Sequence, residues 1–419
     1  MNIRLTRPPS TKVSLVIAVM LVFGAVGTAA LVLSRAATPY LSAEAESGTL
    51  ATSASSITDS TASGGAAVKF AQSGGQAGVC SGAVPAAYSY APLSGRGWPT
   101  TYGQGYIATW KDDKIAATTL TIDDNIVGDH AYWKQKSQET GFKFTWFAVT
   151  GQDSNGKLFT GATWNDFRAL YALGNSIQSH TVTQSTPISN AEMQQSQADI
   201  LREIGVKPLT IAYPDGDNGN EAGAAQYYIA ARGTVGWLNA YKPDDYYNIN
   251  SFSTNINFTS PNNYSYAPAI VDKAFTQDSN PDFYRGWMSV HYHSISTDKP
   301  MVQTTLDWLK AREADIWVAG FDHVAAYARE RDVASLQVTA AGTNCVAFNV
   351  TDTLANATYN EPLTVKVRLQ DTTDWSSVSA QQNGKAVNAR IVTNGTNKYA
   401  LVDAVPDGGA VTVYNPNFN

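Results

Sequence analysis

The hydrophobic pattern of residues 107–332 switches repeatedly between the period of a strand and that of a helix. Short apolar runs bounded by polar or turn residues are typical of buried strands. Such runs occupy residues 117–122, 142–148, 209–213, 287–290 and 316–319. Helical spacing is found at residues 164–173, 189–204, 222–231, 301–313 and 322–331. Strands that alternate with helices predict an α/β domain, either a parallel-stranded distorted barrel or a layered fold.

One of these helices carries a start signal and a stop signal. Ser189 and Glu192 have the spacing of a capping box, in which each side chain binds the other residue's backbone N–H. Gly205 follows the last apolar position of the helix and is expected to end it.

The pattern changes after Asp332, where apolar and polar residues alternate with period two. Leu363, Val365, Val367 and Leu369 would all face one side of a strand. Asn-Gly or Asp-Gly pairs at 383–384, 394–395 and 407–408 predict hairpin turns. We therefore expect a small antiparallel, sandwich-like β-domain over residues 333–419, after an α/β domain over residues 79–332.

The N-terminal segment has the pattern of an export or membrane signal. Residues 13–33 carry no charge and are mostly apolar, and three basic residues precede them. Within residues 1–36 this predicts a transmembrane helix with its N-terminus in the cytoplasm, or a cleaved signal peptide. Either interpretation places the rest of the chain on the extracellular side of the membrane or in the medium. Cys80 and Cys345 would then lie in an oxidising space and are expected to pair, the alternative being two separate thiols.

Residues 37–78 are rich in Gly, Ser, Thr and Ala, which predicts a flexible extracellular linker. Within it, residues 44–48 and 62–70 resemble the opening strands of family 6/35-type carbohydrate-binding modules. The match is far shorter than such a module, and we interpret it as a stalk or a remnant.

Composition excludes several classes of protein. Hydrophobic residues make up 43% of the 419 residues and charged residues 15%, which is too apolar for a chain disordered throughout. The net charge is −6, and there is no basic run, so no nucleic-acid partner is expected. Two cysteines cannot form a zinc site of four thiolates. We expect a monomer.

Polar residues follow four of the expected strands, at the strand ends where active sites of α/β folds collect. Asp123 and Asp124 follow the first strand, and His180 follows a stretch at 175–178. Tyr213 ends another strand, and His293 ends the strand that contains His291. Each of these features taken alone is as easily structural, and only their combination points to one site.

The order and spacing of these motifs resemble the polysaccharide deacetylases of carbohydrate esterase family four. The matching segments are residues 121–124, 180–184, 213–216 and 291–293. The resemblance covers residues 107–332 and implies a distorted (β/α) barrel of the deacetylase type. It implies a hydrolase acting on carbon–nitrogen bonds other than peptide bonds, which removes acetyl groups from an acetylated glycan such as peptidoglycan or a chitin-like chain.

The resemblance also implies a role for each residue of the site. Asp124, His180 and Gln184 would hold a divalent metal, Zn²⁺ or alternatively Co²⁺ or Mn²⁺. Asp123 would be the general base. The backbone N–H of Tyr213 would bind the oxyanion, and His293 would protonate the leaving amine, so that acetate and a free amino sugar result.

Two positions depart from the family pattern. Gln184 stands where the family has its second metal-binding histidine, and His130 is a candidate replacement. Ala212 stands where an arginine often orients the base. These departures leave open an alternative, a non-catalytic glycan-binding protein on the same barrel with a degraded metal site. A glycoside hydrolase, which needs two carboxylates and no metal, is a further alternative.

Overall fold

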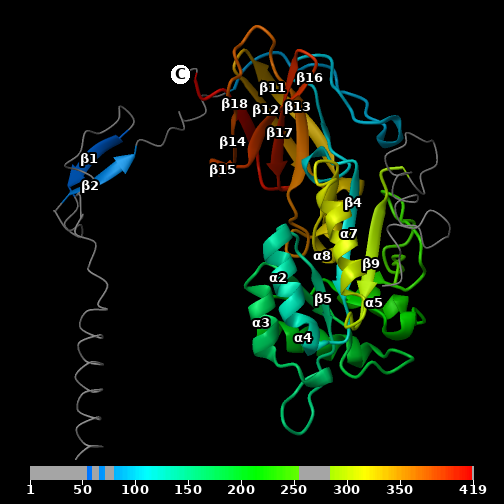
Figure 1. Ribbon diagram of the computed structural model, residues 1–419. Coiled ribbons are helices and arrows are strands. Elements are labelled where there is room, and N and C mark those ends of the chain that lie inside the picture. The colour runs from blue at the N-terminus through cyan, green and yellow to red at the C-terminus, as the bar shows by residue number, and fades with distance from the viewer. Residues whose placement is uncertain (1–53, 59–65, 71–79, 254–283, 418–419) are drawn as a thin grey trace, which may run out of the picture. The chain divides into compact units, whose positions relative to one another are not determined.

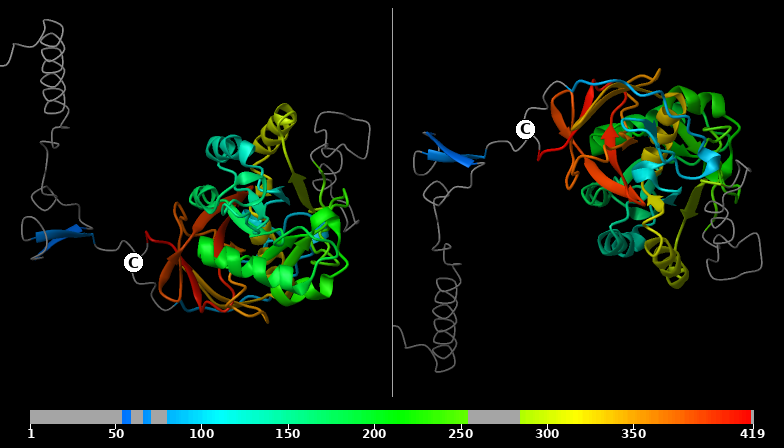
Figure 2. Two further views of the ribbon diagram at one scale, coloured as in Figure 1. Left: turned by 90° about the horizontal axis from the view of Figure 1, so that it is seen from below. Right: turned by 90° about the horizontal axis from the view of Figure 1, so that it is seen from above.

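The computed structural model describes residues 54–58, 66–70, 80–253 and 284–417 (Figures 1 and 2). The chain divides into two compact units, Met1–Gly74 and Gly75–Asn419. In the first unit, β1 (Ala54–Thr58) and β2 (Ala66–Phe70) form an antiparallel pair within the expected linker.

The predicted transmembrane helix finds no support in the residues that the structure describes. Residues 13–33 lie outside the described ranges, and within those ranges no helix combines the length and the apolar character needed to cross a bilayer.

The core of the second unit is a seven-stranded parallel sheet. Its strands are β4 (Ala116–Ile122), β5 (Thr145–Ala148), β6 (Ser176–Ser179), β7 (Thr210–Ala212), β8 (Ala230–Arg232), β9 (Trp287–Tyr292) and β10 (Ile316–Val318). β4 pairs with β9 along its length, with β10 at its start and with β5 at its end. Residues between β8 and β9 span the remaining gap, because Ile249 bridges Arg232 and Phe252 bridges Val290. The sheet is thus a distorted barrel, as the sequence predicts.

Helices connect these strands and cover the outside of the barrel (Figures 1 and 2). They are α2 (His130–Thr140), α3 (Trp164–Tyr171), α4 (Asn190–Ile204), α5 (Glu221–Tyr227), α7 (Lys299–Lys310) and α8 (Phe321–Val333). One predicted helix was too long: residues 222–231 contain α5 and the start of β8. Gly205 ends α4 in the left-handed region, at φ 86°, as expected.

The capping box expected at α4 is only half formed. Ser189 does cap the helix by accepting a hydrogen bond from the Glu192 N–H, but the Glu192 carboxylate binds the backbone N–H groups of Val182 and Thr183 instead. A complete capping box stands at α3, between Thr163 and Asp166.

The C-terminal region forms two antiparallel sheets, in the orange and red part of Figure 1. One has the order β11 (Ser335–Gly342), β12 (Cys345–Thr351), β18 (Val411–Tyr414), β14 (Ser379–Gln382), β15 (Lys385–Val387). The other has the order β16 (Ala389–Asn394), β17 (Asn397–Ala404), β13 (Leu363–Arg368), β3 (Gly105–Ile107). The antiparallel β-domain is therefore confirmed, with β3, which precedes the barrel strands, as an added strand.

Two of the three expected hairpins are present. Residues 383–384 connect β14 to β15, and Gly395 lies between β16 and β17. Residues 407–408 instead lie between β17 and β18, which belong to different sheets, so this turn does not close a hairpin.

Covalent and polar contacts join the barrel to the β-domain. Cys80 and Cys345 form the expected disulfide. Tyr327 on α8 donates to the Ala108 carbonyl at 3.0 Å and accepts from the Thr364 N–H at 3.3 Å. The helix that follows the last barrel strand is thereby fixed against β13.

Candidate active site

The two aspartates after β4 diverge because the backbone turns sharply between them. Asp123 still follows the strand, its N–H donating to the Tyr292 carbonyl at 2.9 Å. Asp124 and Asn125 both adopt left-handed backbone conformations, at φ 64° and 55°. The Asn125 side chain stabilises this turn through two hydrogen bonds to the backbone of Val149, at 2.7 and 2.9 Å. Strained backbone of this kind often marks functional sites.

His180 lies opposite Asp124 with its ring held in one orientation. Its N–H continues the sheet by donating to the Ala148 carbonyl at 2.8 Å, and its Nδ1 lies 2.9 Å from the Ala212 carbonyl oxygen. Because a carbonyl only accepts, Nδ1 must carry a proton. Nε2 then points at Asp124 Oδ1, 3.5 Å away. A proton or a cation must lie between these two acceptors for the contact to be favourable.

Gln184 approaches the same carboxylate. It has a left-handed backbone, at φ 58°, and its Nε2 donates a hydrogen bond to Asp124 Oδ1. The preceding loop is held by Glu192, whose carboxylate binds two of its backbone N–H groups at 2.7 and 2.8 Å. Asp124, His180 and Gln184, the three predicted ligands, are therefore brought together.

Asp123 is buried in an ion pair. It is 1% exposed, and its Oδ2 contacts the Arg232 guanidinium. Burial raises the pKa of Asp123, but Arg232 and the nearby histidines outweigh burial and hold the pKa below its ordinary value. The other oxygen, Oδ1, has no hydrogen-bond partner among the described residues. Asp123 is thus an ionised carboxylate with one oxygen available to accept a proton.

His293 is the exposed member of the site. Its Nε2 lies 3.8 Å from Asp123 Oδ2 and 3.7 Å from Asp124 Oδ2, and its side chain is 51% exposed. The buried ring of His291 lies edge-on to it, with centroids 5.8 Å apart. Burial and then Arg232 lower the pKa of His291 to about 3, so that ring is neutral. A solvent-facing imidazole beside two carboxylates can exchange a proton with a bound ligand.

The backbone N–H of Tyr213, which the sequence predicts to bind the oxyanion, already has a partner in the sheet. The Tyr213 N–H already donates to the Arg232 carbonyl at 3.0 Å. Pro214 has no N–H, so the next donor along the chain is Asp215. Asp215 is exposed and has a left-handed backbone, at φ 54°. Asp215 was not among the predicted site residues, because its left-handed conformation has no local signature in the sequence.

His130 does not replace the missing ligand. Its ring packs against Trp146 and Phe167 in the core, with centroid distances of 4.5 and 5.6 Å. Burial lowers its pKa to about 4. Within the described ranges, no three His, Cys, Asp or Glu side chains are grouped closely enough to form a metal site. The candidate metal centre therefore consists of one carboxylate, one imidazole and one amide.

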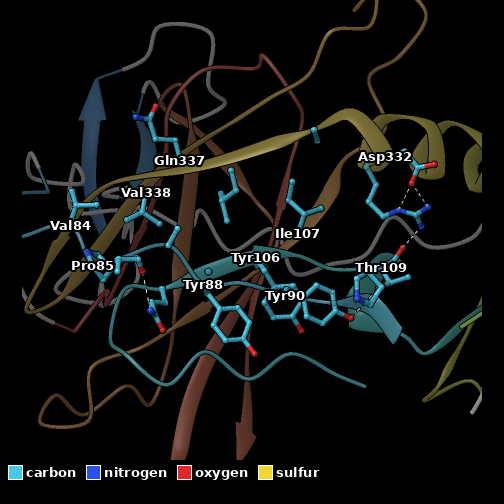
Figure 3. A pocket seen from close by; sticks show the side chains of 18 of the residues that line it. Val84, Pro85, Tyr88, Tyr90, Tyr106, Ile107, Thr109, Asp332, Gln337 and Val338 are labelled. Carbon is cyan, nitrogen blue, oxygen red and sulfur yellow. Dashed lines mark hydrogen bonds and ion pairs between the residues drawn. The ribbon is translucent and has the colours of Figure 1, made fainter. Parts of the chain in front are cut away.

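A large cavity in the described part of the chain lies away from the candidate site. It has a volume of about 640 Å³ and lies among the segment at residues 84–92, β3 and β11 (Figure 3). Two of its tyrosines are already bonded within the protein: Tyr90 to Gly95 and Thr109, and Tyr106 to Gly97 and Asp113. None of its lining residues belongs to the candidate site.

Comparison of the sequence with known proteins finds a curated relative but no matching family model. No family model matches the chain. A gellan lyase from a Bacillus species is 34% identical over 342 residues, covering 75% of this chain but 13% of the lyase. The chain therefore spans only a small part of the length of this relative, whose name is that of a lyase and not of a hydrolase.

Two solved structures illustrate the structural matches. A deacetylase from Streptococcus pyogenes in complex with acetate is 22% identical, covers 32% of this chain and 62% of its own, and has a TM-score of 0.29. A polysaccharide deacetylase from Bacillus cereus is also 22% identical, covers 32% and 46%, and has a TM-score of 0.27. The Bacillus cereus protein carries the name of the family that the four motifs resemble.

Proposed function

We propose that the chain is a metal-dependent polysaccharide deacetylase that removes acetyl groups from an N-acetylated glycan. The observation that carries this proposal is the arrangement around Asp124. His180 is locked with Nε2 facing Asp124 at 3.5 Å, and Asp123 and His293 lie beside this pair. An imidazole held opposite a carboxylate can bind a divalent cation. A backbone carbonyl that fixes the second ring nitrogen is typical of metal-binding histidines.

The residues present fit a cation with two strong ligands and one weak one. Asp124 and His180 would hold it, and Gln184 could offer its amide oxygen after the amide rotates away from its present hydrogen bond. A divalent ion bound there, Zn²⁺ or alternatively Co²⁺ or Mn²⁺, supplies a Lewis acid and a water of lowered pKa.

The remaining roles belong to the protein. Asp123, ionised and held by Arg232, accepts the proton of the attacking water at its free oxygen. The Asp215 N–H stabilises the charge that develops on the acetyl oxygen. His293 is exposed enough to meet the substrate and donates a proton to the departing amine. Acetate and an amino sugar are the products.

The disulfide between Cys80 and Cys345 favours a place of action outside the cytoplasm, because such bonds persist in oxidising compartments. Extracellular glycans are the substrates that this location offers. The same chemistry would cleave an O-acetyl ester, so both kinds of acetyl group belong in a test.

The test is acetate release from acetylated glycans by the full chain, dialysed against a chelator and then supplied with Zn²⁺, Co²⁺ or Mn²⁺. Release that depends on the metal and is lost in Asp124→Ala supports the proposal. New reducing ends without acetate would indicate a glycoside hydrolase. Unsaturated sugars detected by ultraviolet absorbance would indicate a lyase, as in the named relative. Either of these results would overturn the proposal.

A second candidate function is binding of a glycan without turnover. The specific observation in its favour is the hydrogen bond from Gln184 to Asp124, since it occupies an oxygen that a cation would need. Glycan binding by calorimetry, together with no acetate release and no metal uptake, would support this alternative.

A further inference from the structure

Lys366 on β13 is a fully buried lysine that forms an ion pair with a buried aspartate. Its Nζ contacts Oδ2 of Asp113, and the two side chains are 0% and 4% exposed. Asp113 lies in the connection from β3 to β4, so the pair joins the residues just before the barrel to the β-domain. Neither residue belongs to the candidate site.

Aromatic rings surround the amino group of Lys366. Its Nζ lies 3.5 Å from the ring centroid of Trp98, 5.5 Å from that of Tyr106 and 5.9 Å from that of Tyr399. Burial lowers the pKa of Lys366 to about 8, although the Asp113 carboxylate acts in the opposite direction. A lysine of lowered pKa gives up its proton readily and can then act as a nucleophile.

The backbone directs the Asp113 carboxylate toward this lysine. Asp112 and Asp113 both adopt left-handed conformations, at φ 58° and 57°. Oδ1 of Asp112 lies 3.2 Å from Nε of Arg390 at the surface, whereas the Asp113 side chain is buried against Lys366. Strained non-glycine backbone of this kind is common at functional sites. The strain here coincides with the turn that separates a surface carboxylate from a buried one.

The hydrogen bonds around the pair match those of an amide group. Nζ of Lys366 donates to the Gly97 carbonyl at 3.1 Å. The Tyr106 hydroxyl lies 2.9 Å from the same carbonyl and 3.0 Å from Oδ1 of Asp113, to which it can donate. In an amide between Nζ and Cγ of Asp113, the N–H would keep Gly97 as its acceptor and Oδ1 would keep Tyr106 as its donor. Such an amide is fully hydrogen-bonded, whereas the ion pair buries two charges at a cost in desolvation.

We propose that Lys366 and Asp113 form an intramolecular amide (isopeptide) bond in the folded protein. The Nζ–Cγ bond forms and the Cγ–Oδ2 bond breaks. Two protons of the ammonium group pass to Oδ2, which leaves as water, and the third stays on the amide nitrogen. The reaction needs no co-reactant, because the fold holds the two groups in contact and shields them from water. The bond is independent of the proposed function and joins the β-domain to the preceding chain, as the Cys80–Cys345 disulfide also does.

Tyr106 assists the reaction. Burial raises the pKa of its hydroxyl well above the ordinary value, so the hydroxyl keeps its proton. While Nζ attacks Cγ, negative charge develops on Oδ1 of Asp113. The Tyr106 hydroxyl stabilises this charge by donating to Oδ1, as the donors of an oxyanion hole do.

A second lysine–aspartate pair joins nearly the same parts of the chain and serves as a control. Nζ of Lys111 lies 3.0 Å from Oδ2 of Asp403, and the two side chains are 20% and 15% exposed. Water reaches this pair and solvates both charges, so no amide is expected there. The two pairs therefore differ in burial and not in the chemistry of their side chains.

The test is a tryptic map of the reduced and alkylated full chain by mass spectrometry. The bond joins peptide 112–114 to peptide 332–368, uncut at Lys366, as a species lighter than the sum of the two by one water, about 18 Da. Lys366→Arg keeps the cation but cannot form the amide, so its peptides should be separate. Lys111→Arg should still give the joined species.

The wild-type map decides the question even if Lys366→Arg does not fold. Recovery of peptide 112–114 unjoined and in full yield would overturn the inference. A loss of water that maps to residues 407–408 would overturn it as well, because an Asp-Gly pair loses the same mass when it closes to a succinimide. An amide does not titrate, so the joined chain should also lack the pH dependence that Lys366, as an amine with a pKa of about 8, gives the unjoined chain.

Discussion

Replacement of Glu330 by glutamine should remove a large pH dependence of stability. Glu330 lies on α8 and is 0% exposed. Its Oε2 accepts a hydrogen bond from the Glu361 N–H at 2.9 Å, whereas Oε1 has no partner among the described residues. Burial, with smaller contributions from Asp352 and Glu361, raises the pKa of Glu330 from 4.5 to about 8. The folded protein therefore keeps a proton that the unfolded chain releases.

The sign of the effect follows from this difference. Between pH 4.5 and 8 the unfolded chain binds fewer protons at this position than the folded chain, so the free energy of unfolding falls as pH rises. The slope is about 1.4 kcal/mol per pH unit, which gives a loss of about 3 kcal/mol between pH 5 and 7.5. Lys366, whose pKa burial lowers to about 8, changes stability only above this interval.

Urea unfolding at several pH values measures the effect. Relative to the wild type, Glu330→Gln should gain stability steadily from pH 5 to 7.5, whatever its stability at pH 5. Glu313→Gln is the control, because that side chain is 52% exposed and paired with Lys310 at the surface. His323, whose pKa the Glu361 carboxylate raises to about 9, is present in every variant, so its own titration cancels in the comparison. Parallel curves for the wild type and Glu330→Gln would refute the reasoning.

Three further changes test the site and the fold. Gln184→His should raise the affinity for Zn²⁺ roughly tenfold or more, because an imidazole replaces an amide. Competition with a chelating dye measures this affinity. An unchanged affinity would mean that the side chain at position 184 does not reach the cation. Arg232→Met should lower the free energy of unfolding by about 3 kcal/mol, because Asp123 stays buried without its cation, and adding Asp123→Asn should restore most of the loss. Cys80→Ser opens a loop spanning 265 positions and should cost on the order of 4 kcal/mol; thermal unfolding should show the variant equal to the reduced wild type.

The sequence was sufficient for the parts of the site that follow strands directly. Asp123, Asp124 and His293 come at the ends of apolar runs, and parallel strands bring their ends to one edge of the sheet. The period of the pattern also distinguished the barrel from the β-domain. The strand-end residues and the change of period can both be read from the spacing of apolar residues in one sequence.

Other parts of the site depend on contacts that local spacing does not display. The Glu192 carboxylate matches a helix-capping signal, yet it binds the loop that carries Gln184, because the cap and the loop compete for one side chain. The Asn125 bonds to Val149 join two strand ends 24 residues apart. The Tyr213 N–H is used by the Arg232 carbonyl, and the left-handed backbone of Asp215 follows Pro214 without any signal in the spacing. The pattern of hydrophobic positions predicts none of these contacts and conformations.

The position of Arg232 shows how such a contact can change the interpretation of a sequence departure. Ala212, on β7, lacks the arginine that would orient the base, and by sequence this looks like a loss. However, Ala212 and Arg232 are direct partners in the parallel register of β7 and β8. The guanidinium therefore sits at the same level of the barrel, one strand further along, and still reaches Asp123. Because Arg232 supplies the positive charge from the neighbouring strand, the alanine at position 212 is no argument against Asp123 as a general base. Gln184 stands at the candidate cation site, and His130, the expected replacement, lies in the core, so Gln184 is the departure on which the proposed activity depends.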